Sequence, residues 1–531
     1  MKIYKNCIIL TMDETLPYAD YMIVEGGRIA EVGLGLPELE YSGADVVDLH
    51  GNTVIPGFWE SHLHMVDGMR SRMELNLRDC AGLEDLKARL SKYCGTLSEG
   101  EWIVGHGWDE SKLFGGIFPD RELLDKMCSS FPMILIRMDG HSLCANSKAI
   151  DALQLKTLEC SPQVPYGRSG KPSGMFYEDT ATDILNRVVS SFTESYIEKA
   201  VLNAQEHFLR NGITSVNDMC IGYENYFGIY RRLQSEERLK IRITASPYGL
   251  DDSLVKEFGK RERLCSERLK AGPPKYFMDG SFGSRTAFLS EDYADDPGNK
   301  GQKLLSDDML REMIRKNSKA GKPFNIHAIG DQAVSCILDA ISDVCGKSKD
   351  NPRNRIEHIQ IVKPEDIERF KELSVTASFQ PDFLYEVDLT LSRVGKDRLP
   401  NVYRFGSFLE AGVNVIFNSD WPYGGGEFPK KPDGTDYIGF EPLLGIHAAC
   451  CRQMNEKEAV TPLQALKCYT VNAAYANYRE NEIGKLKRGF LADFAVLSKD
   501  ISRCEPDSIL AAEVLMTVIN GEIEYEKNES L

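Results

Sequence analysis

The chain has 531 residues, 42% of them hydrophobic and 27% charged, a balance typical of a globular protein with a large core. Its formal net charge is −17 and its pI is about 5.2. This acidity disfavours nucleic acid or an anionic membrane surface as a partner, because phosphate binding needs a concentrated basic patch.

Targeting signals and cysteine usage predict a cytoplasmic protein. The first residues lack the apolar core of a signal peptide, and no apolar run of about 18 residues predicts a membrane-spanning helix. Fourteen cysteines occur without a C-x-x-C spacing. In a chain of this length they are expected to be reduced, mostly buried thiols.

Short β-type runs occupy both ends of the chain. Residues 1–55 contain several of them, with a Glu-Gly-Gly hairpin signal at 25–27. Similar runs follow at 490–497 and 514–519. Neither end has enough apolar residues for a core of its own. We therefore predict that residues 1–55 and 483–531 together form one small β-sandwich.

The segment that follows the N-terminal runs carries a histidine pair. Asn52–Ile55 is β-branched and apolar, and it predicts a strand that leads through Pro56-Gly57 to His62 and His64. In an extended segment these two side chains point to the same face, where they could chelate a divalent metal. Histidine pairs at this spacing are also common at surfaces without any metal, so further residues must decide.

From residue 213 onward, apolar strand candidates alternate with helical segments. With the strand leading to His62 they make eight, which predicts a (β/α)₈ TIM barrel over residues 56–482, with residues 70–210 as a long insertion over the barrel mouth. Two helices between them are predicted at Asp307–Ala320 and Pro364–Leu373. The other seven strand candidates are 213–216, 241–245, 275–278, 323–326, 355–359, 375–379 and 414–417.

Polar residues stand at the C-terminal ends of particular strands, where barrel enzymes carry their chemistry. Four of the nine histidines of the chain are among them, a placement that chance does not favour. The residues at these ends are His62, His64, Lys275, His327, His358 and Asp420.

These residues lie in segments that resemble the amidohydrolase superfamily, in particular its YtcJ-like (amidohydrolase-3) branch. Residues 56–64 are similar to the family's P-G-[FL]-x-[DE]-x-H-x-H, and residues 275–287 to the branch's K-x-x-x-D-G-S and G-S-R-T-A segments. Four further segments resemble the family's pattern. The fifth and sixth strand motifs are matched by N-I-H-A-I-G-D from Asn325 and R-I-E-H from Arg355, the end of strand eight by N-S-D-W-P from Asn418, and the return into the sandwich by I-G-K-L-K-R-G-F-L-A-D from Ile483.

The resemblance implies one or two zinc or other divalent ions. It makes four histidines metal ligands, Lys275 a carboxylated bridging lysine, and Asp420 both ligand and proton-transferring base. The chemistry is consistent, because neutral imidazoles suit zinc and a carboxylated lysine presents a carboxylate where an ammonium cannot ligate. Alternatives remain: Lys275 could be unmodified beside a single metal, Asp420 a helix N-cap, and the histidines core residues. The four histidines are His62, His64, His327 and His358.

The implied activity is metal-dependent hydrolysis of a carbon–nitrogen bond in a small molecule, such as an amide, N-acyl, N-formyl or cyclic amide compound. By position near the expected mouth, Trp108, Asp139, His141 and Arg285 are predicted to bind substrate, although Arg285 could instead form a structural ion pair. Two other functions stay open: a catalytically silent regulatory or binding protein, and a lyase or isomerase with the same metal site. Homodimers are common in the superfamily, so the resemblance also allows one.

Overall fold

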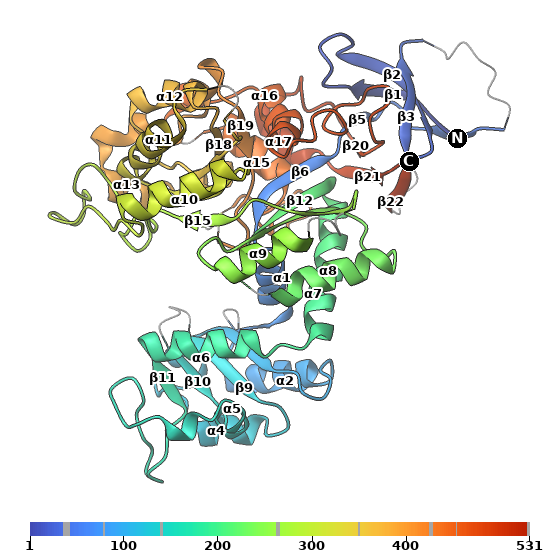
Figure 1. The fold of residues 1–531 in the computed structure, drawn as a ribbon. Helices are drawn as coiled ribbons and strands as arrows, with labels where there is room; N and C mark the ends of the chain where they lie inside the picture. Colours follow the sequence, from blue (N-terminus) through green and yellow to red (C-terminus); the bar gives the residue numbers. More distant parts are fainter. Residues whose placement is uncertain are drawn as a thin grey trace. The chain divides into compact units, whose positions relative to one another are not determined.

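The computed structural model describes residues 1–35, 43–77, 80–137, 142–222, 224–261, 266–348, 351–423, 428–452 and 454–527. It shows a mixed α/β protein with two compact units (Figure 1). The first unit consists of Met1–His64 and Gln205–Leu531, and the second of Met65–Ala204. The predicted insertion, 70–210, covers nearly the same stretch as the second unit.

One sheet of the first unit contains both ends of the chain. Its strands are β1 (Lys2–Leu10), β2 (Tyr18–Glu25), β3 (Arg28–Gly33), β4 (Asp45–Asp48), β5 (Thr53–Pro56), β20 (Phe494–Leu497), β21 (Val514–Ile519) and β22 (Glu522–Glu526). Their order is β22-β21-β20-β5-β1-β2-β3, with β4 paired to β1. The two ends meet where β20 runs antiparallel to β5, with Phe494 opposite Pro56 and Leu497 opposite Thr53.

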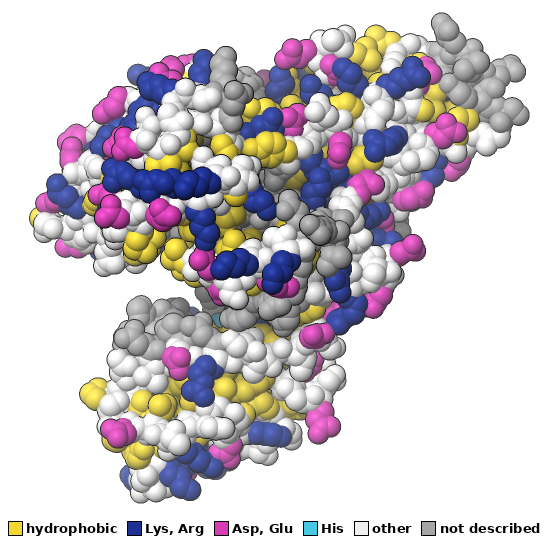
Figure 2. Space-filling model, in the orientation of Figure 1, with side chains coloured by type: hydrophobic (Ala, Val, Ile, Leu, Met, Phe, Trp, Pro, Cys, Tyr) yellow, Lys and Arg dark blue, Asp and Glu magenta, His cyan; other side chains and the backbone are white. Residues whose placement is uncertain are grey.

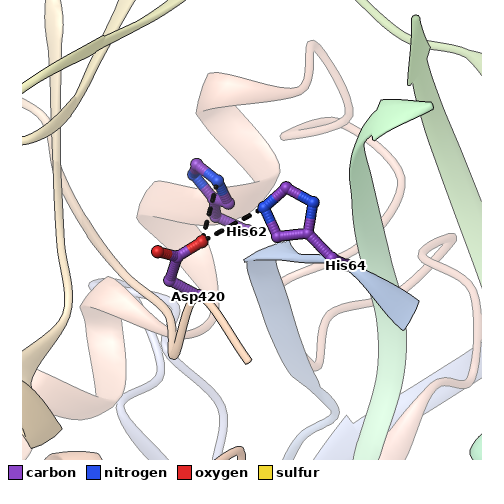
Figure 3. A group of neighbouring side chains, drawn as sticks. All are labelled: His62, His64 and Asp420. Carbon is purple, nitrogen blue, oxygen red and sulfur yellow. Dashed lines mark ion pairs between the residues drawn. The ribbon is translucent and has the colours of Figure 1, made fainter. Parts of the chain in front are cut away.

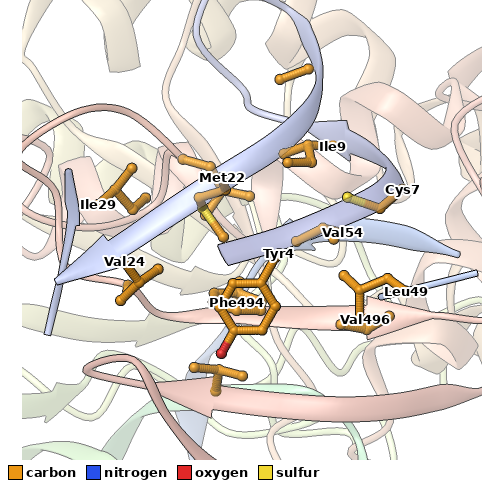
Figure 4. Close-up of a cluster of buried hydrophobic side chains, with 14 of the residues drawn as sticks. Tyr4, Cys7, Ile9, Met22, Val24, Ile29, Leu49, Val54, Phe494 and Val496 are labelled. Atoms are coloured by element: carbon orange, nitrogen blue, oxygen red, sulfur yellow. The ribbon is translucent and has the colours of Figure 1, made fainter. Parts of the chain in front are cut away.

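A shared hydrophobic cluster stabilises this sheet (Figure 4). Tyr4 of β1 packs edge-on against Phe494 of β20, with ring centroids 4.9 Å apart. Val54 and Val496 lie in the same cluster and are fully buried. Since the cluster draws on residues from both termini, each end depends on the other for burial of its apolar side chains. The sequence predicted a sandwich of these strands, which is more than the single sheet described here, so the sandwich stays a prediction.

The remaining strands of the first unit are parallel. They are β6 (Phe58–Leu63), β12 (Ile213–Ile221), β13 (Arg242–Pro247), β14 (Leu269–Ala271), β15 (Lys275–Phe277), β16 (Asn325–Ala328), β17 (Arg355–His358), β18 (Thr376–Phe379) and β19 (Val415–Phe417). They form two parallel sheets, β14-β13-β12-β6 and β15-β16-β17-β18-β19. Two contacts connect these sheets: a parallel bridge joins Tyr248, directly after β13, to Lys275 of β15, and the amide of Asp420, after β19, donates to His62 O of β6 at 2.9 Å.

The sequence predicted one strand leading to the histidine pair, but the structure has two strands in different sheets. Thr53–Pro56 (β5) belongs to the terminal sheet, and the separate strand β6 carries His62. The chain passes between them at Gly57, where an added Cβ would lie 2.3 Å from Thr214 side-chain atoms. Glycine is therefore required at this point of close approach, and it separates two strands that look continuous in the sequence.

Helices follow most of the parallel strands. The predicted helices at 307–320 and 364–373 are confirmed as α10 and as a 3₁₀ turn (Pro364–Asp366) that leads into α12. Ser306 caps α10 by accepting from the amide of Met309, and Asp307 and Asp308 lie in its first turn, near the positive end of the helix dipole. The helices of this region are α8 (Glu224–Ser235), α9 (Asp252–Arg261), α10 (Asp307–Lys319), α11 (Asp331–Cys345), α12 (Ile367–Glu372), α13 (Val387–Val394), α14 (Phe405–Glu410), α15 (Pro442–Cys450), α16 (Pro462–Cys468) and α17 (Val471–Ala476).

The second unit contains one five-stranded sheet with helices around it. The sheet order is β11-β10-β9-β8-β7 and its core includes Trp108. Its strands are β7 (Leu75–Asn76), β8 (Ile103–Trp108), β9 (Met133–Arg137), β10 (Ser142–Ala145) and β11 (Met175–Tyr177). Its helices are α1 (Met65–Met73), α2 (Leu83–Cys94), α3 (Glu110–Leu113), α4 (Arg121–Met127), α5 (Ser147–Ala152) and α6 (Glu178–Ser190), and α7 (Glu194–Arg210) runs across the boundary between the units.

Charged side chains of both signs lie on the surface. Figure 2 shows Lys and Arg side chains interspersed with Asp and Glu on the visible face. Among the described residues, no helix is both long enough and apolar enough to span a bilayer.

Candidate metal centre

His62 is the best-defined member of the candidate centre. It is fully buried at the end of β6, and its Nδ1 lies 2.9 Å from Oε2 of Glu357. A carboxylate only accepts hydrogen bonds, so Nδ1 carries the hydrogen and Nε2 keeps its lone pair. Burial raises the pKa of Glu357, but Arg355 and His62 lower it by more, and the net shift is far below the ordinary value. Arg355 Nε lies 2.9 Å from Glu357 Oε1.

Asp420 stands opposite this lone pair (Figure 3). Its Oδ1 lies 3.3 Å from Nε2 of His62 and 3.3 Å from Nε2 of His64. The ends of β6 and β19 are also joined through the backbone, since His64 N donates to Trp421 O at 2.8 Å. The ligand atoms of His62, His64 and Asp420 all lie within 4.8 Å of one another. This places a carboxylate oxygen between two imidazole nitrogens.

His327 and His358 come from the neighbouring strands β16 and β17. Their ring centroids are 4.4 Å apart, and the ring of His358 lies 5.1 Å from that of His62. His358 Nδ1 contacts Gln380 Oε1 at 2.9 Å, and His327 Nε2 contacts Gly280 O at 2.9 Å. Each ring thus has one nitrogen fixed by an acceptor, which leaves the other nitrogen with its lone pair.

Three of the four imidazoles are held neutral. Burial is the main cause, and it lowers the pKa of His62 to about 4 and that of His327 to about 3. Lys275 lowers both further. The pKa of His358 is well below its ordinary value, first because of burial and then because of His327. Neutral imidazole is the form that ligates metals.

Lys275 completes the group, but it is the first residue of β15 and does not stand at the C-terminal strand end that the sequence predicted. It is 1% exposed, and its Nζ lies 3.5 Å from His62 Nε2. Burial lowers the pKa of its amine, although the carboxylates of Glu357 and Asp420 oppose that shift. A lowered pKa favours the neutral amine, the form in which a lysine reacts with carbon dioxide.

The side chains of this group fit a divalent cation. Oδ1 of Asp420 is buried and makes no hydrogen bond, which is costly for a carboxylate oxygen. Burial raises the pKa of Asp420, but His62 and His64 lower it by more, so the carboxylate stays ionised. An ionised oxygen facing imidazole lone pairs is a donor set typical of zinc and other divalent metals.

Several neighbours of the centre were not predicted from the sequence. Glu357, Gln380 and Asp279 orient its histidines or the loop beside them. Asp279 accepts from the amides of Ile329 at 3.0 Å and Gly330 at 2.8 Å. Burial raises the pKa of Asp279 to about 7. A charged residue inside an otherwise buried strand, such as Glu357 next to His358, is the sequence signal that could have found them.

The four predicted substrate-binding residues have different surroundings. Trp108 is completely buried in the core of the second unit, where its indole N–H donates to Leu135 O at 2.9 Å. Arg285 pairs with Asp295 through two contacts of 3.2 and 2.8 Å, which agrees with the structural ion pair considered above. Asp139 and His141 lie outside the described residues. Substrate binding by these four stays a prediction.

Comparison with known proteins identifies the family. A model described as "Amidohydrolase family" matches residues 45–525. The chain belongs to this family. The match includes all six predicted metal-site residues, and it confirms the resemblance noted in the sequence.

Relatives of this chain extend over nearly its whole length. It is 30% identical over 550 residues to Protein LONG AFTER FAR-RED 3 of Arabidopsis thaliana, covering 98% of this chain and 91% of that protein. It is 27% identical to Putative amidohydrolase YtcJ of Bacillus subtilis, covering 99% of each. It is 25% identical to N-substituted formamide deformylase of Arthrobacter pascens, covering 99% and 98%.

A solved structure agrees with the family. An uncharacterized metal-dependent hydrolase from Pyrococcus furiosus superposes with a TM-score of 0.80 at 30% identity, covering 94% of this chain and 100% of that one. Together with the family match and the His/His/Asp group, this supports a hydrolase with a divalent metal site.

Proposed function

We propose that this chain hydrolyses a carbon–nitrogen bond in a small molecule, of the amide, N-acyl, N-formyl or cyclic amide class. The observation that carries the proposal is the unbonded, ionised oxygen of Asp420, 3.3 Å from Nε2 of both His62 and His64. When bound, a divalent ion, proposed to be zinc, lowers the pKa of water towards about 7 and polarises a carbonyl.

The ion would be held by the side chains that converge on this oxygen. His62, His64 and Asp420 supply the first set, and His327 and His358 extend it towards a second ion. Lys275, buried and near His62, would present a carboxylate to both ions once its neutral amine has reacted with carbon dioxide. A carboxylated lysine is proposed here because an ammonium cannot ligate.

Asp420 has the geometry of a proton carrier. Its pKa is lowered overall, so it is a carboxylate at neutral pH and can accept a proton. In the proposed reaction the Asp420 carboxylate takes a proton from water and gives it to the leaving amine. Glu357 holds the Nδ1 hydrogen of His62, and so it keeps Nε2 directed at the centre.

We also infer that the two parallel sheets close into a (β/α)₈ barrel. They contain nine strands, but β14 ends at Ala271 and β15 begins at Lys275, so these two short strands count as one barrel strand. The contacts that support closure are the bridge between Tyr248 and Lys275 and the hydrogen bond from Asp420 to His62 O. Closure would bring the strand ends that carry the histidines and Asp420 onto one face, as expected for this architecture. Lys275 stands at the start of β15, with its Nζ 3.5 Å from His62 Nε2. We also propose the terminal sandwich, the cytoplasmic location and a homodimer, for the reasons given from the sequence.

Metal analysis combined with a substrate screen in ¹⁸O-labelled water tests the proposed function. The purified protein is assayed against N-formyl, N-acyl and cyclic amide compounds. Hydrolysis places one solvent oxygen in the acid product, and we expect that label. Turnover without solvent oxygen would replace hydrolysis with a lyase or isomerase reaction. A metal-replete protein that turns over no member of the screen would favour the silent regulatory function.

A further inference from the structure

A second group of potential ligands lies outside the centre described above. His447 of α15, Cys451 directly after that helix, and Asp507 of a 3₁₀ turn (Pro506–Ala511) each offer one atom, and these atoms lie within 4.8 Å of one another. Cys451 Sγ is 3.4 Å from Asp507 Oδ1, and His447 Nε2 is 3.9 Å from the same oxygen. Asp507 is 56 positions after Cys451 in the sequence, and it meets the other two residues through the packing of α15 on the turn.

The spacing matches tetrahedral coordination. Zinc lies about 2.0–2.3 Å from nitrogen, oxygen and thiolate ligands, so two ligands on one tetrahedral ion are about 3.3–3.7 Å apart. The contact between Cys451 and Asp507 is within this range, and the contact between His447 and Asp507 needs only a few tenths of an ångström. Asp507 has the freedom to close that gap, because its side chain is 96% exposed.

The imidazole of this group is already oriented. His447 Nδ1 lies 2.8 Å from the hydroxyl of Tyr385, the last residue of another 3₁₀ turn (Pro381–Tyr385). The hydroxyl can accept from Nδ1–H, which leaves the Nε2 lone pair on the side of Asp507. Burial lowers the pKa of His447, and the neutral ring is the form that ligates. An outer hydrogen bond of this kind is characteristic of metal-binding histidines.

We propose that His447, Cys451 and Asp507 form an accessory zinc-type site, distinct from the hydrolytic centre. A mixed nitrogen, sulfur and oxygen set selects zinc among the common cellular divalent ions and disfavours magnesium or calcium. On binding, the thiol of Cys451 loses its proton to solvent and the thiolate sulfur donates a lone pair to the ion. Without an ion this thiol stays protonated, because burial and then Asp507 raise its pKa to about 12.

The site would link three segments of the first unit. Its ion would tie the C-terminal end of α15 to the 506–511 turn, and through Tyr385 it would fix the end of the 381–385 turn. That turn begins directly after Gln380, which contacts Nδ1 of His358. With three protein ligands the fourth position would be left to water, and the ion would act by joining these segments.

Cobalt substitution separates this site from the hydrolytic centre. The six residues predicted for that centre include no sulfur, so a sulfur-to-cobalt charge-transfer band in the near ultraviolet can report only a thiolate ligand. The full-length protein is stripped of metal and titrated with Co²⁺. We expect such a band, with a final intensity that corresponds to one thiolate-bound cobalt per chain, and we expect added Zn²⁺ to displace it. A wild-type titration with no thiolate band would overturn the proposal whatever the activity of the protein.

Single substitutions then locate the sulfur ligand. Cys451→Ser should abolish the band, while Cys450→Ser, the matched change one position earlier, should leave it intact. Tyr385→Phe should keep the band but weaken cobalt affinity roughly 10–100-fold, the usual cost of an outer-sphere partner. A band that survives Cys451→Ser, or one that Cys450→Ser also removes, would refute this ligand assignment. Circular dichroism establishes that each variant is folded.

Discussion

Glu357→Gln tests whether the centre depends on the carboxylate behind His62. The substitution keeps the size of the side chain but removes its charge. Two contacts change: the 2.9 Å contact to His62 Nδ1 and the 2.9 Å ion pair with Arg355. Arg355 is 2% exposed, so it is left as a buried cation without its partner.

Two magnitudes follow from these contacts. Loss of the outer partner of a ligating histidine weakens metal binding roughly 10–100-fold. Breaking a buried ion pair by removing one charge costs about 3–5 kcal/mol of the free energy of unfolding. The folded-state pKa of Glu357 is depressed, so its stabilisation is present above the unfolded pKa and is lost as pH falls below about 4.3. The difference between wild type and variant should shrink in that range.

Isothermal titration of the metal-free protein measures the affinity, and urea unfolding at pH 7 and at pH 3.5 measures the stability. Glu365→Gln is the matched control, because Glu365 is exposed ten residues from Arg355 on the same segment. Wild-type metal affinity together with a wild-type urea midpoint in Glu357→Gln would refute the reasoning. A pH-independent stability difference would remove Glu357's charge as the cause.

Three further predictions concern single residues. Asp420→Asn should keep the fold and lose about 10²–10⁴-fold in kcat on a substrate found in the screen, and near-normal turnover would take Asp420 out of the mechanism. Lys275→Ala should lower the metal content measured by mass spectrometry and regain part of it with added acetate; two retained metals and a full rate would end the bridging hypothesis. Asp493→Asn should lower the free energy of unfolding by about 3–5 kcal/mol, because Asp493 pairs with buried Arg242 at 2.6 Å, and a change below about 1 kcal/mol in urea unfolding would contradict this.

Periodicity was sufficient to predict much of the fold. The segments around His327 and His358 lie on strands β16 and β17, as their apolar runs indicated, and the acidic start of α10 was predicted at Asp307. These features are local, since a short run of residues determines each one. The break at Gly57 was missed because the need for glycine there comes from Thr214, which is distant in the sequence.

The outer partners of the centre could not be predicted for a similar reason. Glu357 of β17 contacts His62 of β6 although the two strands belong to different sheets, and no spacing in the sequence encodes that contact. Trp108 illustrates the opposite case. Its predicted position near the barrel mouth suggested contact with substrate, and the structure packs its whole ring within a core. Side-chain direction at a strand end depends on tertiary packing, which periodicity does not contain.

The placement of hydrogens around His62 gives the strongest physical argument for a cation. Glu357 fixes the ring hydrogen on Nδ1. Burial lowers the pKa of His62 to about 4, so the ring is neutral at pH 7. Nε2 therefore presents a lone pair to Asp420 Oδ1, which is itself ionised and 3.3 Å away. Two acceptors that face each other inside a protein repel unless a positive charge lies beside them. Lys275 Nζ lies 3.5 Å from Nε2, but burial lowers the pKa of this amine and so weakens it as that charge. The hydrogen bond from the Asp420 amide to His62 O keeps the two residues together, so the backbone enforces an arrangement that a divalent ion would make favourable.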